Sequence, residues 1–339
     1  MEKNGGNSTI RDMTSGSPVK LIIQFMIPMF LGNIFQQFYN IADSIVAGQF
    51  LGVRALAAIG STGSLMFFVT GWLNGLSSGF AILVAQWFGA KKYDRMRHYV
   101  AMSIYLMVAF AVAMTIGFEI ANRPIMHLMN YSEEIMPDVT SYMGIIYAGL
   151  IVTAAYNALA AFLRALGDSK SPLYFLIISA AINVLLDIVF IIYVGMGVEG
   201  CAYATVIAQA ISAILCLIYI VKKFPILHLK KENFTVSFQE LGKLLALGIP
   251  MALQFSITAL LYQLISVHAF PAGDQESKPA RLGILTCFRK DQFVFSSFQC
   301  FFQIIEIMNS AFYKGRELAQ LGTSHSRLHI RCFQVISEM

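Results

Sequence analysis

Long apolar runs separated by short polar segments dominate this sequence. A helix that crosses a bilayer needs about 20 mostly apolar residues. Six runs meet this requirement, at about 21–47, 57–86, 98–120, 139–163, 172–195 and 198–221. A seventh run begins near 240 and continues to about 266. The pattern therefore predicts an all-α integral membrane protein, with a six-helix lobe followed by the start of a second repeat.

Charged residues in the connecting segments predict how these helices are oriented. The segments after the second, fourth and sixth runs are rich in Lys and Arg, whereas the segment after the third run is net acidic. Cytoplasmic loops of membrane proteins carry an excess of Lys and Arg. We therefore expect residues 1–17 to form a cytoplasmic N-terminus of a multi-pass protein of the cell (plasma) membrane. Arg54, on a segment that this alternation places outside, is an exception.

The composition agrees with the hydropathy pattern. Hydrophobic residues make up 57% of the 339 residues and charged residues 13%, against roughly 45–50% and about 25% in soluble domains. Five Cys with no paired spacing predict no disulfide framework. The net charge of +5 resides largely in the polar connections, so we expect a lipid bilayer and no nucleic acid as a partner.

A short repeat suggests two related halves. The tripeptide Ile27-Pro28-Met29 returns as Ile249-Pro250-Met251, 222 residues later. Six-span halves repeated in parallel are a known transporter architecture, although two unrelated helix-start prolines remain the alternative. We therefore divide the chain into a six-span lobe at 18–222 and a segment at 223–266, which holds a cytoplasmic linker and the first helix of a second lobe.

The last segment, 267–339, differs from the rest of the chain. It holds 8 Lys or Arg, 6 Asp or Glu and 3 of the 5 Cys, and no run of 18 apolar residues. We interpret it as an atypical tail that is not the native continuation, as a frameshift would produce. A divergent cytoplasmic tail is the alternative.

Polar side chains inside the apolar runs are the candidate functional residues. Ionisable residues within a span are costly and usually functional. Asp43 lies in the first run, Asn183 and Asp187 share a helix face in the fifth, and Thr205 lies in the sixth. At a rise of about 1.5 Å per residue, Asp43, Asp187 and Thr205 lie roughly 5–12 Å inside the outer edge. Their oxygens suit a proton or a hard cation such as Na⁺.

These residues also have simpler interpretations. Asp43 could be a boundary residue that contacts external water, and Asn183 could hydrogen-bond a neighbouring helix. Gly71, Gly75 and Gly79 follow one another at a spacing of four, which allows close approach between helices in lipid.

No catalytic motif accompanies these polar groups. The sequence has no HExxH, nucleophile elbow or phosphate loop, so we expect neither an enzyme nor a cofactor. We expect His98, His127 and His228, near the predicted membrane edges, to be solvated. His325, His329 and Cys332 resemble part of a metal cluster but lack a fourth ligand.

Taken in order along residues 15–260, these features resemble the multidrug and toxic compound extrusion (MATE) family. The resemblance rests on Pro28, Gln36, the run Tyr39-Asn40-Ile41-Ala42-Asp43, the segment Leu163-Arg164-Ala165-Leu166-Gly167-Asp168-Ser169, Asn183 with Asp187, and Ala202-Tyr203-Ala204-Thr205. It implies a twelve-span secondary antiporter of two lobes. Such a protein exports organic, often cationic, drugs or toxic compounds in exchange for H⁺ or Na⁺.

The resemblance also implies roles for individual residues. Asp43, Asn183, Asp187 and Thr205 would bind the coupling cation, Gln36 would line the cavity near them, and Pro28 would permit the first helix to bend. Two other functions remain open: a lipid-linked oligosaccharide flippase of related architecture, and a non-transporting membrane fragment. Transport by rocking would require the missing second lobe as a partner.

Overall fold

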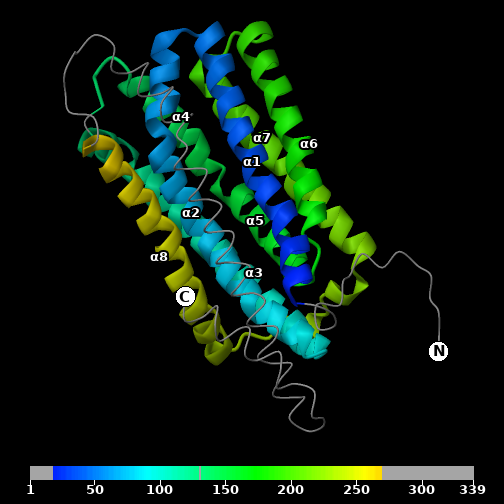
Figure 1. The fold of residues 1–339 in the computed structure, drawn as a ribbon. Coiled ribbons are helices and arrows are strands. Elements are labelled where there is room, and N and C mark those ends of the chain that lie inside the picture. The colour runs from blue at the N-terminus through cyan, green and yellow to red at the C-terminus, as the bar shows by residue number, and fades with distance from the viewer. Residues whose placement is uncertain (1–17, 130, 269–339) are drawn as a thin grey trace.

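The computed structural model describes residues 18–129 and 131–268, and these residues form helices joined by short connections (Figure 1). The α-helices are α1 (Pro18–Phe50), α2 (Val53–Gly89), α3 (Tyr93–Leu128), α4 (Met136–Ala148), α5 (Leu150–Ala165), α6 (Lys170–Ile188), α7 (Val198–Lys223) and α8 (Phe238–His268). A π-helix, η1 (Val189–Tyr193), extends α6, and two 3₁₀ turns, η2 (Pro225–Leu227) and η3 (Lys231–Phe234), connect α7 to α8. The described residues contain no strand, which confirms the all-α prediction.

The predicted runs correspond to these helices, although the first run, at 21–47, lies in α1, in which only Met26–Gln36 forms a shorter apolar helix. Five helical segments are long and apolar enough to cross a membrane: α2, α3, α6 with η1, α7 and the described part of α8. The bent pair of α4 and α5 gives a sixth. The predicted segment 1–17, and the predicted tail apart from Val267 and His268, lie outside the described residues.

The fourth span differs from the prediction of one continuous helix over 139–163. It consists of two helices that meet at Gly149 with a bend of 49°. A Cβ atom at Gly149 would lie 2.5 Å from a methyl carbon of Val206 on α7. Glycine therefore permits α7 to approach the joint closely, and it also weakens the helix locally.

The helices pack around α2. This helix contacts α3, α5 and α8, while α1 packs beside α6 and α6 beside α7 (Figure 1). The apolar core follows α2, where Val69, Leu73, Leu76 and Phe80 have no exposed surface. Large hydrophobic side chains on the outer faces of α3, α6 and α7 are exposed, as expected where helices face lipid.

Helices α2 and α8 approach each other closely at the glycines for which the sequence predicted close helix contact. A Cβ atom at Gly75 would lie 2.4 Å from the Cα atom of Ala252, and one at Gly79 would lie 2.6 Å from the Cα atom of Gly248. Backbones at this separation require glycine. The close approach predicted from the glycine spacing is thus confirmed for two of the three glycines, and the partner is α8.

A buried carboxylate fixes the turn between α5 and α6. Asp168 accepts hydrogen bonds from the backbone N–H groups of Lys170 and Ser171, at 3.2 and 3.0 Å, and from the hydroxyl of Ser171 at 2.6 Å. The hydroxyl of Tyr219 on α7 donates a fourth, at 3.2 Å. One side chain therefore accepts hydrogen bonds from the free backbone N–H groups at the start of α6 and also connects this end of α6 to α7.

Arg54, the exception to the predicted alternation of loop charges, forms an ion pair. Its Nε atom lies 2.9 Å from a carboxylate oxygen of Asp138, at the start of α4. The positive charge that violated the predicted alternation is therefore paired with one of the acidic residues that follow the third span.

Candidate functional site

The four side chains predicted to bind a cation converge from three helices. Asp43 comes from α1, Asn183 and Asp187 from α6, and Thr205 from α7. All four are buried, with 5%, 0%, 0% and 1% of their surface exposed. The amide nitrogen of Asn183 donates a hydrogen bond to the hydroxyl oxygen of Thr205, at 3.4 Å. The structure therefore brings these residues together, and Asp43 is not a water-exposed boundary residue.

Two carboxyl groups lie side by side in this site. The Asp187 carboxyl group lies within hydrogen-bonding range of that of Asp43. Apart from Asp43, no group among the described residues donates a hydrogen bond to either carboxyl oxygen of Asp187. Two adjacent carboxylates in apolar surroundings repel each other unless a proton or a cation lies between them. The pair therefore has the chemistry of a site for a proton or a hard cation.

Hydrogen bonds between α6 and α7 hold the frame of this site. The Ser179 hydroxyl donates to the backbone oxygen of Ala208 at 2.9 Å, and the Ser212 hydroxyl donates to that of Phe175 at 3.1 Å. With the Asn183 contact, they form a polar seam along two otherwise apolar helices.

The backbone also changes immediately after the site. One residue past Asp187, α6 gives way to the π-helix η1. Short π segments inside α-helices are rare and often accompany functional sites.

The structure adds two residues that the sequence did not indicate. Tyr142 on α4 and Cys201 on α7 lie near enough to both carboxyl groups to interact with them electrostatically, and they are 3% and 1% exposed. Cys201 precedes Thr205 by one helical turn, so it shares a face with a predicted site residue and this spacing could have identified it. Tyr142 carries no such signal, because a tyrosine within an apolar run is ordinary.

The two remaining predicted positions lie further along α1. The side chain of Gln36 is exposed and precedes Asp43 by seven residues, about two helical turns. Pro28 is buried, and α1 continues through it without a break. The predicted bend at Pro28 and the predicted cavity at Gln36 stay predictions.

A metal cluster is not part of the described structure. Over residues 18–129 and 131–268, no group of three His, Cys, Asp or Glu side chains is arranged to hold a metal ion. The candidates His325, His329 and Cys332 lie outside these residues.

Comparison with known proteins agrees with the resemblance seen in the sequence. The model of the MatE family matches residues 28–189. The probable multidrug resistance protein YpnP of Bacillus subtilis (strain 168) is 29% identical over 250 residues, which cover 73% of this chain and 55% of YpnP. The probable multidrug resistance protein YoeA of the same strain is 30% identical over 243 residues, 70% of this chain and 52% of YoeA.

Solved structures show the same fold. A MOP superfamily transporter from Pyrococcus furiosus aligns with a TM-score of 0.73 at 22% identity, covering 94% of this chain and 72% of that chain. The chain itself spans about half the length of the curated relatives it matches. In its matched sequence and in the helical fold around it, this chain is an integral membrane protein that is similar to the MatE family.

Proposed function

We propose that this chain forms the N-terminal lobe of a secondary active antiporter, which exports organic, often cationic, compounds in exchange for H⁺ or Na⁺. The names of YpnP and YoeA, both probable multidrug resistance proteins, support drug-like molecules as the substrate class. The acidic character of the buried site favours a cation over an anion as the coupling ion.

The paired carboxyl groups of Asp43 and Asp187 carry this proposal. A proton or Na⁺ that binds between them relieves their repulsion, and its release restores that repulsion. Because the pair joins α1 to α6, loading and release of the ion change how strongly the two helices attract each other. Asn183 and Thr205 supply further oxygens for Na⁺, and their mutual hydrogen bond keeps them in place.

Transport by alternating access also requires a second bundle, against which the first can rock. We propose that a second lobe completes the central cavity and that α8 is its first helix. In this arrangement the lobe lies in the plasma membrane with its N-terminus in the cytoplasm, as the loop charges predict.

The test is ethidium efflux from bacterial cells that lack their own drug pumps and that produce this lobe together with the second lobe that the proposal requires. We expect Asp187→Asn, which keeps the size of the side chain but removes its charge, to abolish efflux above the background of empty cells. The matched control is Asp94→Asn, because the Asp94 side chain is 91% exposed at the start of α3. This control should export at the wild-type rate.

Two further measurements complete the test. Immunoblots of membrane fractions should show equal amounts of the three proteins. A protonophore and a sodium ionophore, added separately, should identify the coupling ion by which of them stops efflux. Wild-type efflux by Asp187→Asn would overturn the proposal.

A further inference from the structure

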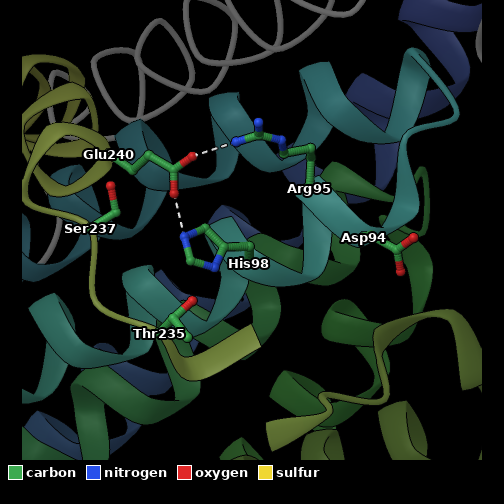
Figure 2. A pocket seen from close by; sticks show the side chains of 6 residues that line it. All are labelled: Asp94, Arg95, His98, Thr235, Ser237 and Glu240. Atoms are coloured by element: carbon green, nitrogen blue, oxygen red, sulfur yellow. Dashed lines mark hydrogen bonds and ion pairs between the residues drawn. The ribbon is translucent and has the colours of Figure 1, made fainter. Parts of the chain in front are cut away.

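A second polar cluster lies at the predicted cytoplasmic side, where the beginnings of α3 and α8 meet next to η3 (Figure 2). It surrounds an open cavity of about 430 Å³, lined by Asp94, Arg95, His98, Thr235, Ser237 and Glu240. None of these residues belongs to the candidate cation site. The cluster connects the six-span lobe to the helix that follows it.

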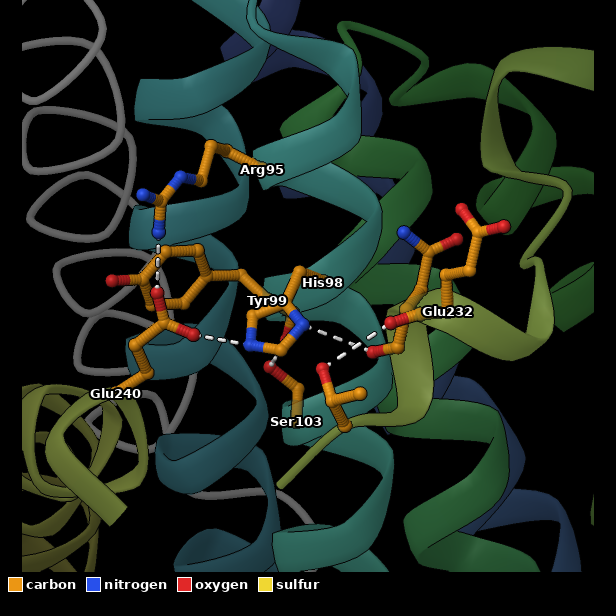
Figure 3. Close-up of polar contacts among 8 residues, drawn as sticks. Arg95, His98, Tyr99, Ser103, Glu232 and Glu240 are labelled. Carbon is orange, nitrogen blue, oxygen red and sulfur yellow. Dashed lines mark hydrogen bonds and ion pairs between the residues drawn. The ribbon is translucent and has the colours of Figure 1, made fainter. Parts of the chain in front are cut away.

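Glu240 is the centre of this cluster. Its side chain is only 10% exposed, and one carboxylate oxygen accepts a hydrogen bond from Nη1 of Arg95 at 2.8 Å. Its other oxygen pairs with Nε2 of His98 (Figures 2 and 3). One carboxylate on α8 therefore holds two side chains of α3, which lie more than 140 positions earlier in the sequence.

The second ring nitrogen of His98 also has an acceptor. Nδ1 lies 3.0 Å from the backbone oxygen of Asn233 in η3. A backbone carbonyl and an ionised carboxylate can only accept hydrogen bonds, so each ring nitrogen must carry a hydrogen for both contacts to be favourable. This geometry is that of the positively charged imidazolium form. His98, which we expected to be solvated, lines the open cavity, but only 15% of its side chain is exposed.

We propose that His98 is a pH-sensitive latch, which in its protonated form holds η3 and the start of α8 against α3. Loss of one ring proton leaves a nitrogen lone pair facing either the Glu240 carboxylate or the Asn233 carbonyl. Either contact then becomes repulsive, and the Arg95–Glu240 pair is left to hold α8 alone. Arg95 is 61% exposed, so its pair is screened by solvent.

The other charged groups of these elements do not replace this role. On α3, Asp94 pairs with Arg97 at 2.8 Å, and the ring of Tyr99 lies edge-on to that of His98. Four other charged residues lie nearby in the sequence. Lys230 immediately precedes η3, Lys231 and Glu232 lie in η3, and Lys243 lies near the start of α8. Carboxylate, lysine and arginine side chains ordinarily keep their charge between pH 5.5 and 8, whereas histidine is the side chain that changes charge there.

Hydrogen–deuterium exchange of the full chain in lipid nanodiscs tests the latch. After correction for the pH dependence of intrinsic exchange, peptides covering residues 231–243 should exchange about tenfold faster at pH 8 than at pH 5.5. This factor follows from the loss of the ion pair between His98 and the buried Glu240 carboxylate. Peptides from the middle of α2 should show no such difference. The measurement does not depend on whether the chain exports anything.

Three variants distinguish a latch from a general effect on folding. His98→Gln and Glu240→Gln should each make residues 231–243 exchange at the same rate at both pH values. Neither variant retains the ion pair whose charge depends on pH. His228→Gln is the matched control, since His228 also lies in the connection to α8 and its Nε2 atom lies 2.9 Å from the backbone oxygen of Val221 rather than near a carboxylate. It should keep the wild-type difference.

Two results would overturn the latch. One is equal exchange of residues 231–243 at both pH values in the wild-type chain. The other is a pH difference that survives in His98→Gln or Glu240→Gln.

Discussion

Substitution of Gly75 by alanine tests how tightly α8 packs against α2. The added Cβ atom would lie 2.4 Å from the Cα atom of Ala252 and 2.6 Å from the backbone oxygen of Met251. Carbon atoms in ordinary contact are about 3.5–4.0 Å apart, so the two helices must separate by roughly 1 Å. The obstacle is backbone on both sides, and no side-chain rotation can relieve it.

The expected cost follows from two opposing effects. Overpacking of this kind typically costs about 1–3 kcal/mol. Alanine stabilises the interior of a helix by roughly 0.5–1 kcal/mol relative to glycine. The first effect is larger, so Gly75→Ala should lower the free energy of unfolding by about 1–2 kcal/mol.

Gly63 provides a matched control on the same helix. Among the described residues, nothing lies within 4 Å of the position that its Cβ atom would occupy. Gly63→Ala should therefore leave stability unchanged or raise it slightly. The assay is reversible unfolding of each purified full-length variant by increasing mole fractions of SDS in mixed micelles, followed by circular dichroism. If Gly75→Ala is as stable as Gly63→Ala, α8 does not pack against α2 as described.

Three further changes probe the ends of the helices in the same unfolding assay. Asp168→Ala removes the acceptor of four hydrogen bonds and should lower the free energy of unfolding by about 2 kcal/mol. Arg54→Ala should cost less than about 1 kcal/mol, because its ion pair with Asp138 is largely exposed. Burial raises the pKa of Tyr131, between α3 and α4, from 10.0 to about 12. The folded protein therefore favours the neutral phenol, and stability should fall as the pH rises from about 10 to about 12. Tyr131→Phe should weaken that dependence, and a decline identical to the wild type would contradict this account.

The order of the helices followed from the sequence, because long apolar runs have few alternatives in a membrane protein. Their number also followed, except that the fourth run forms two helices. Helix ends were less predictable. The third apolar run suggested a span at 98–120, whereas α3 extends from Tyr93 to Leu128. The backbone hydrogen bonds of α3 continue through charged residues at both of its ends. Hydropathy locates only the apolar part of a helix, so it does not detect these extensions.

The bend at Gly149 could not be predicted for a different reason. Glycine is common in membrane helices and does not by itself end or bend them. What distinguishes Gly149 is the contact with Val206, more than 50 residues away on α7. Periodicity along one segment carries no information about such a neighbour.

The candidate site was more visible than its surroundings. Buried carboxylates are rare enough within a span that Asp43 and Asp187 stood out without any structure. Tyr142 and Cys201 did not, since an aromatic ring or a thiol is compatible with an apolar helix whether or not it faces a polar site. Sequence reasoning therefore identified the groups that are costly to bury and missed those that cost little.

Two different kinds of contact hold α8 against the rest of the lobe. One end of α8 is held by the charged cluster of Arg95, His98 and Glu240, and its middle is held by backbone packing at Gly75 and Gly79. The packing is apolar and insensitive to pH, whereas the cluster depends on a proton. A change in pH can thus loosen the start of α8 without separating the two helices along their length. The packing of α8 on Gly75 and Gly79 can stay in place while the cluster of Arg95, His98 and Glu240 opens. One end of α8 can then move while the fold is retained.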